Sequence, residues 1–282
     1  MIEVEKATYS ISMMCRVLEV SRSGYYASAK LGSISKRMER DMDLTKKIRK
    51  VHEDSRGTYG SPRVHAQLKR DGETVSLERV ARLMQEAGIK GKVKRRYKAT
   101  TDSNHRRPVT PNLLKRDFGT QTPDSTWCAD ITAVPTATGF VYLAVIIDVG
   151  TRLVVGWAAD RNMETQLITR ALENALAWRE PVAEIIHHSD RGSQYASHGY
   201  QDALAASGIT SSMSRAGNCW DNALMESFFG TYKQEWAHHH RWQGLRDMQE
   251  ATHDYIEAFY NRTRLHSSIG YRTPMEADEE AA

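Results

Sequence analysis

The chain has 282 residues, of which 40% are hydrophobic and 26% are charged, a composition that excludes a disordered or fibrous protein and predicts a folded, soluble one. The longest apolar run, residues 141–147, is far shorter than the roughly 20 residues that a membrane-spanning helix needs, so we expect no membrane association. The net charge of +4 conceals a strong asymmetry along the chain.

The two parts of the chain differ in charge. Residues 1–119 carry 27 Lys and Arg against 14 Asp and Glu, a net charge of +13, whereas residues 120–282 carry 12 against 21, a net charge of −9. A basic region suits a polyanion, and clustered carboxylates suit divalent cations. The charge pattern therefore predicts nucleic acid as the main partner. Three cysteines without paired spacing predict neither disulfides nor a cysteine zinc site, which favours a cytoplasmic location.

Residues 1–89 show helical patterns. We divide them into an N-terminal segment, residues 1–40, and a helix-turn-helix-like module, residues 41–89. In the module, Ser61 can cap a helix whose first turn contains Pro62, and Ser76 can cap a second helix with apolar residues at i, i+3, i+4 and i+7. Two capped helices joined by a short turn predict a DNA-binding unit, although such pairs are also common core elements of helical domains.

Residues 90–122 form a basic linker. Eight Lys and Arg stand against one Asp between positions 90 and 107, and no hydrophobic periodicity crosses this stretch. The composition predicts an extended segment that follows DNA phosphates, and a solvated tether is a compatible interpretation. The phosphate contacts that we expect are Lys92, Lys94, Arg95 and Arg96.

Residues 123–282 change to an α/β pattern. Three strands are predicted first, then a helix, then two shorter strands separated and followed by helices, an order that indicates a mixed five-stranded sheet flanked by helices. The predicted strands are residues 127–134, 140–147, 153–159, 183–187 and 209–213, and the main helices are residues 165–178 and 247–260.

Three carboxylates fall on this pattern. Asp130 lies in the first strand, Asp190 follows the fourth strand, and Glu226 lies on a later helix. Lys233 comes seven residues after Glu226 and shares its helical face. Carboxylate oxygens suit Mg²⁺ or Mn²⁺, and three acids that converged without a metal would raise one another's pKa.

Other polar residues near these acids have simpler interpretations. Asp148 and Asp221 are explained by a turn and by helix capping, so we leave both out of the acidic site. His187 and His188 are adjacent in a strand and point to opposite faces, so at most one could reach a metal. Arg262 and Arg264 follow the last predicted long helix, and we expect them either to contact phosphate or to play a structural role.

The sequence resembles the OrfB-type insertion-sequence transposases, which belong to the DDE group with a retroviral-integrase-like, ribonuclease-H-like core. The resemblance covers nearly the whole chain and rests on several blocks in a fixed order. These blocks are Cys15–Leu18 with Ser21–Tyr26, Thr58–Arg63, the surroundings of Asp130, Asp190 and Glu226, Lys233, Tyr260–His266 and Gly270–Pro274.

The resemblance implies an enzyme that performs metal-dependent DNA strand cleavage and strand transfer at insertion-sequence ends. Asp130, Asp190 and Glu226 would be the catalytic and metal-binding triad for two Mg²⁺ or Mn²⁺ ions, and Lys233 would contact DNA. The implied partners are terminal inverted repeats, target DNA, further copies of the chain and an upstream OrfA-type protein or fusion, on the bacterial nucleoid.

Two alternative functions use the same sequence features. A structure-selective DNA nuclease would share the carboxylates and the fold but would not join strands. A non-catalytic DNA-binding regulator of transposition would have no need for three intact acids, and all three are present. The extent of the family blocks favours the transposase over both.

Overall fold

The computed structural model describes residues 2–29, 35–92, 110–114, 122–180, 184–215 and 219–281. Its first three helices are α1 (Ile2–Glu5), α2 (Ile11–Val17) and α3 (Arg22–Ala29). These helices share a small core of Ile2, Met14 and Cys15. Within the described ranges, no helix is long and apolar enough to cross a membrane.

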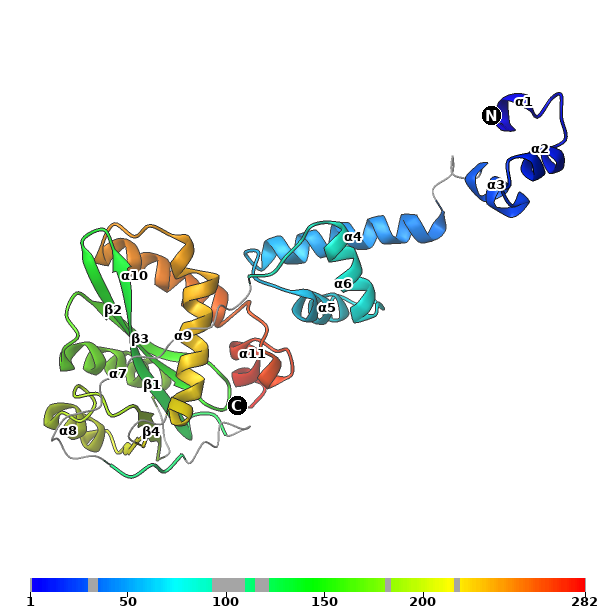
Figure 1. Ribbon diagram of the computed structural model, residues 1–282. Coiled ribbons are helices and arrows are strands. Elements are labelled where there is room, and N and C mark those ends of the chain that lie inside the picture. The colour runs from blue at the N-terminus through cyan, green and yellow to red at the C-terminus, as the bar shows by residue number, and fades with distance from the viewer. Residues whose placement is uncertain are drawn as a thin grey trace.

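A three-helix module follows (Figure 1). Its helices are α4 (Lys36–Asp54), α5 (Ser61–Arg70) and α6 (Leu77–Glu86). Ser35 and Ser76 cap α4 and α6, because their hydroxyls accept backbone N–H groups of the first turn. At α5 the helix begins at Ser61 itself, so Gly60 rather than Ser61 takes the N-cap position, with Pro62 in the first turn.

The second half of the chain forms a mixed five-stranded sheet, as predicted. Its strands are β1 (Thr126–Thr136), β2 (Gly139–Asp148), β3 (Val154–Asp160), β4 (Ile186–Ser189) and β5 (Thr210–Met213). The strand order is β3-β2-β1-β4-β5. β2 is antiparallel to both of its neighbours, whereas β4 is parallel to both of its neighbours.

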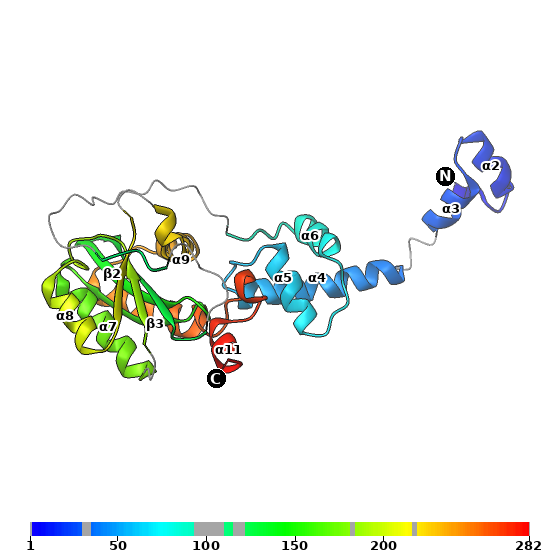
Figure 2. The ribbon, with the colours of Figure 1, turned by 90° about the horizontal axis from the view of Figure 1, so that it is seen from below.

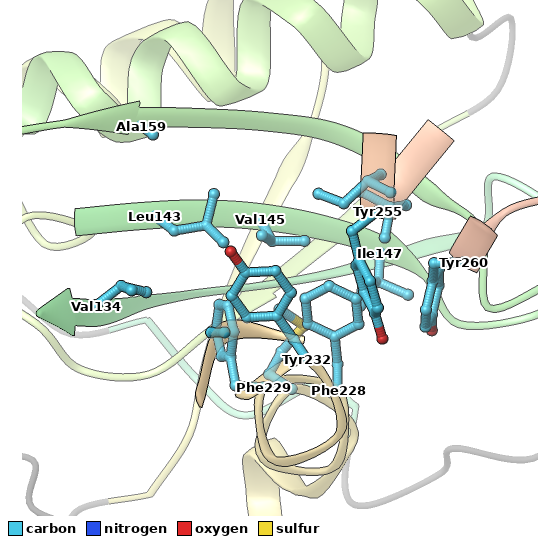
Figure 3. Packing of buried hydrophobic residues seen from close by; sticks show 14 of the residues in the cluster. Val134, Leu143, Val145, Ile147, Ala159, Phe228, Phe229, Tyr232, Tyr255 and Tyr260 are labelled. Carbon is cyan, nitrogen blue, oxygen red and sulfur yellow. The ribbon is translucent and has the colours of Figure 1, made fainter. Parts of the chain in front are cut away.

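Helices cover both faces of the sheet (Figures 1 and 2). α7 (Thr165–Arg179) and α8 (His198–Ala206) pack on one face. α9 (Ala223–Glu235) and α10 (Leu245–His253) pack on the other. On this second face Phe228, Phe229 and Tyr232 of α9 lie against apolar side chains of the strands (Figure 3). The aromatic contacts therefore fix α9 on the sheet.

The structure divides the helix predicted over residues 247–260 into two elements. α10 runs to His253, and the chain continues in wider, π-helical turns over Asp254–Tyr260. These turns bury Tyr255, Ile256, Phe259 and Tyr260, so the widened geometry supplies four side chains to one core. The chain ends with a 3₁₀ turn (Ser267–Ile269) and α11 (Pro274–Glu279).

The C-terminal segment returns to the three-helix module, and α11 lies beside it in both views (Figures 1 and 2). The Tyr59 hydroxyl donates to the Thr263 carbonyl at 3.0 Å and accepts the Leu265 N–H at 2.7 Å. Arg70 forms an ion pair with Glu276. The module and the sheet domain are therefore joined by direct contacts as well as by the linker.

Candidate active site

Parallel pairing of β1 with β4 places two of the predicted acids side by side. Ala129 is the partner of Ser189 in this register, and Asp130 and Asp190 are the next residues of the two segments. Opposite residues of neighbouring strands point to the same face of a sheet and lie about 5 Å apart. The two carboxylates therefore start from adjacent positions on one face.

Strand alternation shows which face this is. Cys128 and Val134 of β1 belong to the core under α9, whereas Trp127 and Ala129 belong to the core under α7 and α8. Because side chains alternate with a period of two, Asp130 lies on the same face as Cys128. Asp130 and Asp190 therefore start on the face that α9 covers.

Glu226 and Lys233 come from α9 itself. Glu226 lies in the first turn and is exposed, and Lys233 lies seven residues later and is half-buried. At 3.6 residues per turn a spacing of seven returns to the same side of the helix. The helix face that carries Glu226 thus also carries Lys233.

The four charged groups act on one another. The pKa of Asp130 is raised well above its ordinary value, first by burial and then by the charges of Asp190 and Glu226, while Lys233 opposes the rise. Burial lowers the pKa of the Lys233 amine, and Asp130 partly offsets this. Asp190, Glu226 and Lys233 are therefore near enough to Asp130 for their charges to shift its pKa.

Backbone groups orient two of the carboxylates. The Ile131 N–H donates to Asp130 Oδ1 at 2.7 Å, and the Gly192 N–H donates to Asp190 Oδ1 at 2.8 Å. A β-carbon on Gly192 would lie 2.9 Å from the same Asp190 oxygen, so the glycine allows this close approach.

The donor set fits a hard divalent cation, because every candidate ligand is a carboxylate oxygen. Among the described residues, no three His, Cys, Asp or Glu side chains form a group that could hold a metal ion. The three acids are therefore near one another without converging on a single point.

The predicted DNA contacts fall in different environments. Lys92 is half-buried, and its Nζ donates to the Glu235 carbonyl at 2.7 Å. Burial lowers the pKa of the Lys92 amine. Arg262 is exposed beside a shallow groove near Trp157 at the β3 edge. Lys94, Arg95 and Arg96 lie outside the described residues.

Arg264 differs from the expectation that it contacts DNA. Its side chain is 5% exposed and forms an ion pair with Glu235, which is itself buried. The Arg264 guanidinium thus faces a carboxylate inside the protein, and we withdraw it from the DNA-binding residues. Of the two interpretations of this arginine pair, the structural one holds for Arg264.

Sequence reasoning missed Glu235. It follows Glu226 by nine residues on α9, a spacing that places it on the opposite side of the helix. A glutamate on the apolar side of an amphipathic helix was the available signal. Asp148 was correctly interpreted: its carboxylate accepts the N–H and hydroxyl of Thr151 and the N–H of Asp124 in a turn.

Known families match most of the chain. Residues 39–97 match the HTH-like domain, and residues 120–219 and 207–274 each match the integrase core domain. Over 280 residues the chain is 36% identical to the transposase InsF of insertion sequence IS3A from Escherichia coli strain K12, covering 99% of this chain and 97% of that protein.

The chain is also similar to a second insertion-element protein in sequence and to a viral intasome chain in structure. The chain is 44% identical over 267 residues to a 31 kDa protein of insertion element IS600 from Shigella sonnei, covering 95% of this chain and 98% of that protein. It is 16% identical, with a TM-score of 0.48, to a chain in a cryo-EM structure of a simian T-cell lymphotropic virus intasome, covering 76% of this chain and 69% of that chain.

Proposed function

The chain belongs to the transposase family of bacterial insertion sequences, and from that membership we propose which residues act on DNA and how. It is a DNA transposase, and its integrase core makes it a polynucleotidyl transferase. We assign the chemistry to Asp130, Asp190 and Glu226, with two Mg²⁺ or Mn²⁺ ions as cofactors.

One observation carries the assignment. The parallel register of β1 and β4 brings Asp130 beside Asp190, on the face covered by α9, the helix that supplies Glu226. Three carboxylates held close together repel one another, and bound cations offset that repulsion. The all-oxygen donor set favours Mg²⁺ or Mn²⁺ over softer metals.

The reaction is in-line displacement at phosphorus. One P–O bond of the DNA backbone breaks as another forms, with water as the attacking group in cleavage and a freed 3′-hydroxyl in strand transfer. Divalent ions held by Asp130, Asp190 and Glu226 would supply activation of the attacking oxygen and stabilisation of the leaving one. No covalent bond between protein and DNA is needed.

The protein's own residues have separate tasks. The Ile131 and Gly192 N–H groups hold the Asp130 and Asp190 carboxylates in place. To Lys233, on the face of α9 that carries Glu226, we assign contact with a DNA phosphate. Further phosphate contacts are assigned to Lys92, Lys94, Arg95, Arg96 and Arg262.

The partners that we propose are the terminal inverted repeats, a target DNA and further copies of the chain bound on the DNA, in the cytoplasm at the nucleoid. An upstream OrfA-type protein or fusion would share recognition of the ends. The HTH-like domain supports DNA binding by residues 39–97.

A pre-nicked DNA end tests the function. Hydrolysis and joining are scored separately, with Mg²⁺ and with EDTA. A transposase joins the 3′-end to a second duplex, a nuclease only hydrolyses, and a regulator does neither. Joining that needs the divalent ion supports the proposal, and its absence with hydrolysis retained would favour the nuclease.

A further inference from the structure

His188 and Asp221 connect the two elements that carry Asp190 and Glu226. These acids are separated by 35 residues and lie on the end of β4 and the start of α9. His188 is on β4, two residues before Asp190. Asp221 is in the 3₁₀ turn Cys219–Asn222 that leads directly into α9. A contact between them therefore fixes one element against the other.

The His188 ring is bonded through both nitrogens. Nε2 lies 3.0 Å from the Asp221 carbonyl oxygen, which can only accept, so Nε2 carries the proton. Nδ1 then accepts from the Ser212 hydroxyl of β5 at 2.9 Å. Ser212 Oγ in turn accepts the Leu113 N–H at 2.9 Å. The imidazole is buried and held in one tautomer and one orientation.

The Asp221 side chain is held from a different direction. Its carboxylate accepts from Asn112 Nδ2 at 2.8 Å, and from the Arg215 backbone N–H, Nε and Nη2 at 3.0, 2.9 and 3.0 Å. The side chain is fully buried, although the Arg215 side chain is 56% exposed. The start of α9 is thus tied to β4 through the Asp221 main chain, and to Asn112 and the segment just after β5 through the Asp221 side chain.

We propose that His188 and Asp221 are positioning residues that set the separation between Asp190 and Glu226. The inference rests on the assignment of these acids to the metal site. Neither side chain is proposed to touch metal or DNA. Loss of a supporting hydrogen bond behind metal ligands lowers metal affinity or activity by about 10- to 100-fold.

The test compares His188→Leu with His188→Gln in the full chain. Leucine fills a similar volume without a donor, whereas glutamine places an amide N–H near the position of Nε2. Mn²⁺ binding is measured from the electron paramagnetic resonance signal of free Mn²⁺, and joining of a pre-nicked DNA end is measured at saturating DNA. His188→Leu should weaken Mn²⁺ binding and joining by about 10- to 100-fold. His188→Gln should recover most of both.

His187→Leu is the matched control. His187 is the neighbouring buried histidine on the opposite face of β4, where its Nε2 lies 3.0 Å from the Tyr200 hydroxyl. This variant should lower stability while its folded molecules keep wild-type Mn²⁺ affinity. An equal loss in both variants would reduce the role of His188 to general stability and overturn the proposal.

Arg215→Met keeps the proposal testable if His188→Leu does not fold, because the arginine side chain is 56% exposed and the residue 215 backbone N–H and Asn112 still bond the Asp221 carboxylate in this variant. Arg215→Met should weaken Mn²⁺ binding by a smaller factor than His188→Leu does. Unchanged Mn²⁺ affinity in folded His188→Leu would overturn the proposal, and where His188→Leu does not fold, unchanged Mn²⁺ affinity in Arg215→Met would overturn it. Wild-type Mn²⁺ binding and joining by Asp130→Asn would instead overturn the assignment of the acids, whatever the variants at position 188 do.

Discussion

Arg264 and Glu235 form a bidentate ion pair that is almost completely shielded from water. Both hydrogen bonds, from Nε to Oε2 and from Nη2 to Oε1, are 2.8 Å long, and the Tyr255 hydroxyl also donates to Oε2 at 3.2 Å. The pair joins the end of α9 to the segment that follows the π-helical turns. At the other end of α9, near Glu226, the Asp221 carbonyl accepts from His188, so the structure secures this helix at both ends.

The first prediction concerns this pair. Arg264→Met should lower the free energy of unfolding by about 3–5 kcal/mol, because it removes the bidentate partner of the buried Glu235 charge and leaves only the longer ion pair with Arg63, at 3.9 Å. Arg262→Met, two residues away and exposed, should change it by less than about 0.5 kcal/mol. Urea unfolding of both variants measures the difference. Equal stability of the two would contradict the buried pairing.

The second prediction concerns the three acids. Asp130→Asn, Asp190→Asn and Glu226→Gln should each slow cleavage and joining by at least about 10³-fold, because several kcal/mol of transition-state stabilisation depend on the ions. DNA affinity and fold should persist, as measured by gel shift and circular dichroism. Asp202→Asn, an exposed acid on α8, is the control and should act like the wild type. Any of the three variants with near-normal joining would be removed from the site.

The third prediction concerns the cation. Mg²⁺ and Mn²⁺ should support joining, and Ca²⁺ should allow DNA binding with little chemistry, because its longer and looser coordination holds the reacting oxygens poorly. EDTA should abolish joining, and added Mg²⁺ should restore it. Joining at the full rate in EDTA would rule out the metal mechanism.

The fourth prediction separates Lys92 from the other linker cations. Replacing Lys94, Arg95 and Arg96 with Gln should weaken binding to all DNA sequences alike and should make the slope of log affinity against log salt shallower by about 0.9 for each phosphate that the protein no longer neutralises. Lys92→Gln should change the slope less, because its amine is bonded to the Glu235 carbonyl.

Filter binding across a salt series gives these slopes, and the joining rate at saturating protein gives the control. That rate should stay near the wild-type value in the triple variant, since none of its three residues is proposed to touch the metal. An unchanged slope in the triple variant would show that the linker is a passive tether.

The sequence allowed prediction where the signal is local. Alternation in β1 and the apolar run in β2 predicted these strands to within two residues, because one-sided or complete burial leaves its pattern in the residues themselves. The Lys233 placement followed from helical spacing alone. In the same way, Ser76 was correctly predicted as an N-cap.

Long-range pairing left no such signal. The register that sets Asp130 beside Asp190 depends on β1 and β4, which are separated in the chain by β2, β3 and α7. Arg262 and Arg264 look alike in sequence, and only Glu235, 29 residues from Arg264, distinguishes them. The widened turns over Asp254–Tyr260 also escaped prediction, because their apolar residues fit an ordinary helix nearly as well.

The contact between the Tyr59 hydroxyl and Leu265 links the packing of the three-helix module to a residue that is synthesised near the end of the chain. Leu265 is fully buried in the core of the three-helix module, 206 residues from Tyr59, and Tyr271 packs against the same core. The ribosome makes the module early, at about 5–20 residues per second, but its core stays open until Leu265 emerges. A chain interrupted before that point therefore lacks two of the side chains that pack in this core, so we expect its three-helix module to unfold at a lower urea concentration than in the full chain.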